Sequence, residues 1–209
     1  SISKLPANDE EALQDSMILR VKNQLKIRTE DVSFVIDELK IMFEKDKRFS
    51  QVADFDNIGI FGHSFGGCTS IMSAYNDTRI DAVLGLDAYF LPLPKEIIKK
   101  DLNTPFVHLG QVSWGNSDNY EVMSELGKSS NQEFYHFAIE GSKHNDYTDF
   151  SQFTKLTRKF GSGKISPKSI RYIMNDVMLG FFDYHLKNRS IFDHNQYQKK
   201  YESVKTYVY

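Results

Sequence analysis

Cysteine, proline and long apolar runs are scarce in this chain of 209 residues. Its one cysteine, Cys68, excludes an internal disulfide and a zinc site built from several cysteines. No apolar run approaches the roughly 20 residues that a membrane-spanning helix needs. The net charge of −2 comes from 26 basic and 28 acidic residues, which are interspersed, so nothing indicates nucleic-acid binding. The composition predicts a single globular domain over residues 1–209.

What the chain does contain is a glycine-flanked serine directly after a short apolar run. Residues 58–61 predict a strand buried on both faces, residues 62–66 read GHSFG, and residues 67–75 predict a helix. Strand, turn and helix around G-x-S-x-G are typical of a nucleophile elbow, whose glycines leave room for a sharp turn. Ser64 is therefore the candidate nucleophile. The backbone N–H of Phe65 is positioned by the motif to donate to an oxyanion.

The remaining segments predict a mostly parallel α/β sheet flanked by helices. Strands are expected at residues 80–86, 105–109 and 133–139. Helices are expected at about residues 10–26, from an N-cap at Thr29 onward, and at residues 169–187. Residues 1–9 are expected to form a loop, residues 111–127 a loop near the site and then a short helix, and residues 191–209 carry no clear pattern.

A serine hydroxyl needs a neighbouring base to accept its proton and a carboxylate to orient that base. His144 stands just past the last predicted strand, at the end of a parallel sheet where functional groups collect. His63 lies inside the elbow and is expected to face away from Ser64, in local packing. His108 and His136 are expected in the interior with their hydrogen bonds satisfied, whereas His185 and His194 are expected on the surface.

Two aspartates compete for the role of the orienting carboxylate. Asp87 ends the strand that follows the elbow, whereas Asp118 lies in the expected loop after the next strand, and the residues alone favour neither. Asp146 and Asp149 are too close to His144 in sequence to brace its ring from behind. No spacing of Asp, Glu and His indicates a metal site, and acyl transfer by such a set needs no cofactor.

Three motifs occur in a fixed order: GHSFGG at residues 62–67, LDAY at residues 86–89 and GSKH at residues 141–144. In this order they resemble the plasma-type platelet-activating factor acetylhydrolases, lipoprotein-associated phospholipases of the α/β-hydrolase fold. The similarity runs from about residue 54 to residue 153, and less clearly through residues 169–187. The resemblance implies that Ser64 is the nucleophile, Asp87 the acid and His144 the base, with Phe65 in the oxyanion hole.

The implied activity is hydrolysis of carboxylic esters through an acyl-enzyme, on short or oxidised acyl groups of phospholipids. Such a substrate implies peripheral contact with a lipid surface. The chemistry of the residues themselves supports a carboxylic ester and leaves its alcohol open. The alternative is a non-catalytic hydrolase-like module for binding or interaction, which keeps the three residues by descent.

The four predicted strands are only part of the sheet that the α/β-hydrolase fold carries. In that fold a loop after an earlier strand supplies the second oxyanion N–H. The chain is therefore expected to be the C-terminal half of the fold, without its N-terminal strands. We expect it to require that half, in the same chain or a second one, because an open edge of an apolar parallel sheet promotes aggregation.

Overall fold

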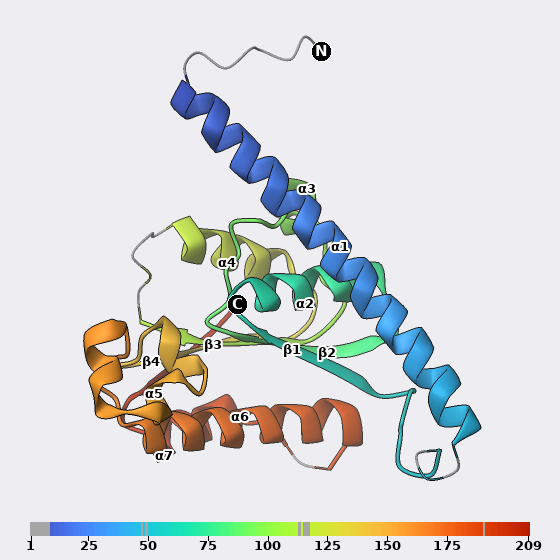
Figure 1. The fold of residues 1–209 in the computed structure, drawn as a ribbon. Helices are drawn as coiled ribbons and strands as arrows, with labels where there is room; N and C mark the ends of the chain where they lie inside the picture. The colour runs from blue at the N-terminus through green and yellow to red at the C-terminus, as the bar shows by residue number, and fades with distance from the viewer. Residues whose placement is uncertain (1–8, 47, 49, 113, 115–117, 190) are drawn as a thin grey trace.

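The computed structural model describes residues 9–209 apart from 47, 49, 113, 115–117 and 190 (Figure 1). The longer helices are α1 (Asp9–Lys45), α2 (Phe65–Asn76), α4 (Asp118–Ser129), α6 (Pro167–Lys187) and α7 (His194–Lys200). Short helical turns are α3 (Lys95–Ile98), η1 (His144–Tyr147), α5 (Phe150–Phe153) and η2 (Lys155–Phe160). The strands are β1 (Ile58–His63), β2 (Ile80–Leu86), β3 (Phe106–Gln111), β4 (Phe134–Ile139) and β5 (Val204–Val208).

In the described part of the chain the strands form one five-stranded sheet in the order β1-β2-β3-β4-β5. The first four strands are parallel, and β5 pairs antiparallel with β4. The predicted, mostly parallel sheet flanked by helices is therefore confirmed. Residues 191–209, which carry no clear pattern in the sequence, contribute α7 and β5.

Helices cover both faces of the sheet, and each face has its own apolar cluster (Figure 1). Along β2 the side chains alternate between the two clusters, as the period of two in a strand requires. Ala82 and Leu84 pack toward α6, whereas Val83 packs toward α2 and α1. Cys68 of α2 is fully buried in the second cluster, and burial raises the pKa of its thiol.

The N-terminal region differs from its prediction, because the two helices expected on either side of Thr29 are one continuous helix, α1. Thr29 does not cap a helix: it is buried, and its Oγ1 donates to the carbonyl oxygen of Leu25 at 2.8 Å. A threonine hydroxyl can serve either role, and no glycine or proline interrupts this segment. Asp9, expected in a loop, already belongs to α1, and the rest of that loop lies outside the described residues.

Strand β1 lies at the edge of the sheet, so the expectation that it is buried on both faces is wrong. The side chain of Phe61 is 56% exposed. A groove of about 280 Å³ runs beside the strand, between Val35 and Ile36 of α1 and Ile58 and Ile60 of β1. Among the described residues no strand pairs with the outer edge of β1. An apolar edge of this kind is a template for another strand.

None of the helices in the described ranges combines the length and the apolarity needed to cross a bilayer.

Candidate active site

The predicted strand, turn and helix surround Ser64. Strand β1 ends at His63, α2 begins at Phe65, and Ser64 has φ 56° and ψ −121°. This backbone conformation is rare and strained for a residue with a side chain, and it persists because the surrounding structure holds it. The backbone N–H of Ser64 donates to the carbonyl of Leu86 at 3.0 Å, and its carbonyl accepts from the N–H of Tyr89 at 3.0 Å. The hydrogen bonds to Leu86 and Tyr89 therefore fix the turn.

The tightness of the elbow explains one of its two glycines. A Cβ added at Gly62 would lie 2.3 Å from the backbone carbon of Gly66, which no real side chain tolerates. A Cβ at Gly66 would meet no atom within 4 Å, so the expected steric need for glycine there is wrong. The second crowded position is Gly67, where a Cβ would lie 2.5 Å from the Cβ of Ala88.

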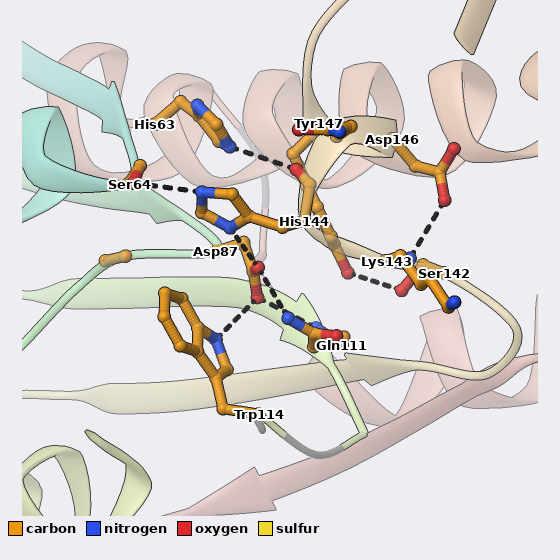
Figure 2. Close-up of polar contacts among 12 residues, drawn as sticks. His63, Ser64, Asp87, Gln111, Trp114, Ser142, Lys143, His144, Asp146 and Tyr147 are labelled. Carbon is orange, nitrogen blue, oxygen red and sulfur yellow. Dashed lines mark hydrogen bonds and ion pairs between the residues drawn. The ribbon is translucent and has the colours of Figure 1, made fainter. Parts of the chain in front are cut away.

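Ser64, His144 and Asp87 lie together although they are far apart in the sequence (Figure 2). The Nε2 atom of His144 is 3.0 Å from Ser64 Oγ, and its Nδ1 atom is 2.6 Å from Asp87 Oδ2. His144 begins η1, just after β4, and its side chain is 35% exposed. Asp87 follows β2 and is fully buried. Asp118, the other candidate acid, is not in a loop but begins α4.

The carboxylate of Asp87 is held by donors that the sequence did not single out (Figure 2). Its Oδ1 atom accepts from the backbone N–H of Gln111 at 3.1 Å and from Trp114 Nε1 at 3.1 Å, and its Oδ2 atom accepts from Gln111 Nε2 at 2.9 Å. These bonds satisfy a buried carboxylate and fix its orientation toward His144. The only sequence signal for Gln111 and Trp114 is that they lie at, or just beyond, the carboxyl end of β3.

An outer layer of aromatic side chains supports the same acid. The hydroxyl of Tyr120 donates to the carbonyl of Gln111 at 2.5 Å. Burial, and then the charge of Asp87, raises the pKa of Tyr120, so the phenol stays a donor. The ring of Trp114 lies 5.1 Å from the ring of His144, at an angle of 72°. The imidazole is therefore packed on one side and hydrogen-bonded at both nitrogens.

Asp146 holds the loop that carries His144, rather than its ring. The buried Asp146 Oδ2 accepts from the backbone N–H of Lys143 at 2.8 Å and from that of Gly163 at 2.6 Å. Figure 2 shows the first of these bonds beside the contact of 2.8 Å between Ser142 Oγ and the Tyr147 hydroxyl. The expectation that Asp146 does not brace the ring agrees with this arrangement.

A family described as "Platelet-activating factor acetylhydrolase, isoform II" matches residues 13–207. The chain belongs to this family. The resemblance inferred from the three short motifs is thereby confirmed, and the family match extends well beyond the residues 54–153 over which the motifs placed it.

Curated relatives of this family member are described as platelet-activating factor acetylhydrolases. It is 28% identical over 143 residues to a platelet-activating factor acetylhydrolase of Gallus gallus, covering 67% of this chain and 34% of the relative. It is 28% identical over 166 residues to one of Canis lupus familiaris, covering 78% of this chain and 35% of the relative. The matched stretch thus spans about a third of the length of these relatives.

Among solved structures, this member of the acetylhydrolase family is similar to a ferulic acid esterase from Streptomyces cinnamoneus. The TM-score is 0.67 and the identity 23%, and the match covers 82% of this chain and 51% of the esterase. At this identity the likeness speaks for the fold alone. It assigns the family member to the α/β-hydrolase fold.

The two interior histidines of this acetylhydrolase-family chain are only partly satisfied. His108 Nε2 accepts from the backbone N–H of Ala88 at 3.1 Å. Its Nδ1 atom, and Nε2 of His136, are buried without a hydrogen-bond partner among the described residues. Burial lowers the pKa of His108 and brings that of His136 to about 4, so both rings stay neutral near pH 7.

The two histidines expected on the surface of this family member lie deeper than predicted. His185 packs its ring 4.6 Å from that of Phe181, and burial lowers its pKa to about 4. His194 is half-buried and stacks on Tyr135 at 5.1 Å. Aromatic side chains cover these two histidines, and the sequence around each histidine does not reveal such contacts.

No group of three or more His, Cys, Asp or Glu side chains that could hold a metal ion occurs among the residues the structure describes. A cavity of about 750 Å³ lies beside the His144 loop, lined by Asp146, by residues of α5 and η2 and by the start of α6. Neither Ser64 nor His144 lines it, so it is not the space in which their chemistry would occur.

Proposed function

We propose that this chain carries the catalytic residues of a serine hydrolase that cleaves carboxylic esters. Ser64 is the nucleophile, His144 the base and Asp87 the acid that orients the base. The single observation that carries the proposal is the continuous hydrogen-bond chain from Ser64 Oγ through both nitrogens of His144 to Asp87 Oδ2, with contacts of 3.0 and 2.6 Å. The hydroxyl of Ser64 makes no capping bond to α2, which leaves it available for this chain.

The mechanism is acyl transfer in two steps. As Ser64 Oγ attacks the ester carbonyl carbon, its proton passes to Nε2 of His144, and Asp87 stabilises the imidazolium that forms. Collapse of the tetrahedral intermediate breaks the bond to the alcohol, which takes that proton and leaves. Water, deprotonated in turn by His144, then attacks the acyl-serine, releases the carboxylic acid and restores Ser64.

The oxyanion of each tetrahedral intermediate would be stabilised at the start of α2. Phe65 is the first residue of this twelve-residue helix, so the N–H of Phe65 has no partner within the helix. The positive end of the helix dipole also faces the elbow. A second donor is expected from a part of the protein that precedes β1, because the fold supplies it from a loop after an earlier strand.

The proposed substrate is a phospholipid with a short or oxidised acyl group. The support is the membership of this chain in a family whose curated relatives are described as platelet-activating factor acetylhydrolases. The three side chains of the site suit a carboxylic ester and do not select its alcohol, so the proposed substrate class rests on the family.

A lipid surface is the proposed setting of the reaction. Three apolar side chains stand exposed close to one another in the sequence on α5 and η2: Phe153 at 78%, Leu156 at 58% and Phe160 at 70%. Arg158 and Lys159 lie in the last turn of η2 beside them. Apolar side chains next to cations are the pattern of a segment that enters the interface of a membrane with anionic lipids.

Replacing Phe153 and Phe160 together by serine is expected to weaken binding to phosphatidylcholine–phosphatidylglycerol vesicles by about tenfold or more, because two apolar anchors are lost. Sedimentation with the vesicles measures the bound fraction. Ile191→Ser is the matched control, since Ile191 is 83% exposed but lies outside this segment. Equal binding by the double variant and the control would contradict a docking role for α5 and η2.

The proposed unit is the C-terminal part of one α/β-hydrolase domain that requires its N-terminal strands. The open outer edge of β1, the exposed Phe61 and the apolar groove between β1 and α1 support this proposal.

A fluorophosphonate probe tests the enzyme proposal directly, because it reacts only with an activated serine. We expect it to label Ser64 in the intact protein, and Ser64→Ala to remove the label. Mass spectrometry of the labelled peptide identifies the site. If the probe leaves Ser64 unlabelled while an unrelated serine hydrolase reacts under the same conditions, the chain is a non-catalytic hydrolase-like module instead.

A further inference from the structure

His63, the residue before Ser64, contacts the loop of the base rather than the nucleophile. Its Nε2 atom is 3.0 Å from the backbone carbonyl oxygen of His144 (Figure 2). Because a carbonyl oxygen can only accept, Nε2 of His63 carries the proton in this bond. The two imidazole rings lie 4.4 Å apart at an angle of 37°. The contact joins the elbow to η1, 81 residues further along the chain.

We propose that His63 is a positioning residue for His144: its Nε2–H holds the backbone of the base so that the imidazole reaches Ser64 and Asp87 at once. The role rests on the proposed function of Ser64, His144 and Asp87. The elbow then serves the reaction twice, with one residue that supplies the nucleophile and the preceding residue that fixes the base.

The anchoring of the His144 loop explains why this bond matters. On the N-terminal side of His144, Asp146 holds the backbone N–H of Lys143. On the C-terminal side, His63 holds the carbonyl of His144 itself. The ring is held between a donor and an acceptor, with Nε2 3.0 Å from the Ser64 hydroxyl and Nδ1 2.6 Å from Asp87 Oδ2, so a shift of its backbone lengthens at least one of these contacts. A displacement of about 1 Å in a catalytic group can lower the rate about 100-fold.

The charge state of His63 suits this role. Burial, together with the nearby His144, lowers its pKa, so the ring stays neutral near pH 7. A neutral donor can hold the carbonyl while His144 becomes an imidazolium, whereas a second cation 4.4 Å away would oppose that step.

The test compares His63→Gln with His63→Leu in the intact protein. Glutamine keeps an N–H donor at about the reach of Nε2, and leucine keeps apolar volume without a donor. We expect His63→Leu to lower kcat by about 10- to 100-fold with KM changed less than about twofold, because the base is misplaced but substrate contacts remain. His63→Gln is expected to recover at least half of the lost activation free energy. A loss of the same size in both variants, or in neither, overturns the proposal.

A second measurement is independent of turnover. The proton in the short bond between His144 Nδ1 and Asp87 Oδ2 should give a strongly deshielded proton resonance, which His63→Gln retains and His63→Leu shifts or broadens. An unchanged resonance in His63→Leu overturns the positioning role. If the wild-type protein shows this resonance and its loss in His63→Leu, but neither ester turnover nor fluorophosphonate labelling, the positioning role stands and the proposed function fails.

Discussion

Asp87→Asn is expected to lower kcat for a chromogenic ester by about four orders of magnitude, with little change in KM. The reason lies in the donors around the carboxylate. The Oδ1 position accepts from the N–H of Gln111 and from Trp114, so the amide oxygen of asparagine will occupy it. The amide NH₂ then faces Nδ1 of His144, which must give up its proton to accept a bond. The proton moves to Nε2, and the imidazole can no longer take the proton of Ser64.

Asp118→Asn is the matched control, because it makes the same change at the aspartate that the sequence places equally well. Asp118 begins α4, so we expect its variant to stay within about threefold of wild type. Steady-state kinetics of both variants, with fluorophosphonate labelling of Ser64 as a second readout, separates the two carboxylates. Near-normal turnover of Asp87→Asn with a large loss in Asp118→Asn would transfer the role to Asp118.

Residues 1–209 produced alone are expected to self-associate and to hydrolyse the same ester at less than about 1% of the rate of the intact protein. Two features of the described chain predict this. The outer edge of β1 has no partner strand among the described residues, and Phe61 is 56% exposed beside it. The N–H of Phe65 is the one oxyanion donor that we propose in this chain, and loss of a single donor lowers kcat by about 10²- to 10³-fold in enzymes of this type.

Light scattering coupled to size exclusion measures the association, and the kinetic assay measures the activity. Phe61→Lys separates the two effects, because a charge on an edge strand opposes strand addition but supplies no oxyanion donor. We expect this variant to associate less and to stay inactive. Robust esterase activity in a monodisperse monomer of residues 1–209 would show that no further half is needed.

Much of the fold and of the elbow could be predicted because their signals are local. Strands β2, β3 and β4 are short apolar runs, and the ends expected for β2 match those observed. The prediction failed where one residue can serve two roles. Thr29 can cap a helix or donate to its own preceding turn, and only the packing of α1 on α2 decides between them.

The support of the acid could not be predicted, because it depends on strand register. Leu86 of β2 pairs with Leu109 of β3, which brings Gln111 beside Asp87. The donors from Gln111 and Trp114 come from 24 and 27 residues away in the sequence. The contact of His63 could not be predicted either, because its acceptor, the carbonyl of His144, lies on the loop that follows a different strand, β4.

By itself the sequence indicated a candidate nucleophile, Ser64, and a candidate base, His144, because a serine in a glycine-flanked turn and a histidine beyond a strand are each specified by their neighbours in the chain. Only the tertiary structure decided which aspartate faces His144, which donors hold that aspartate and what His63 contacts. These contacts join side chains from separate segments of the chain. Their distances are set when the strands pair in register and the helices pack on both faces of the sheet.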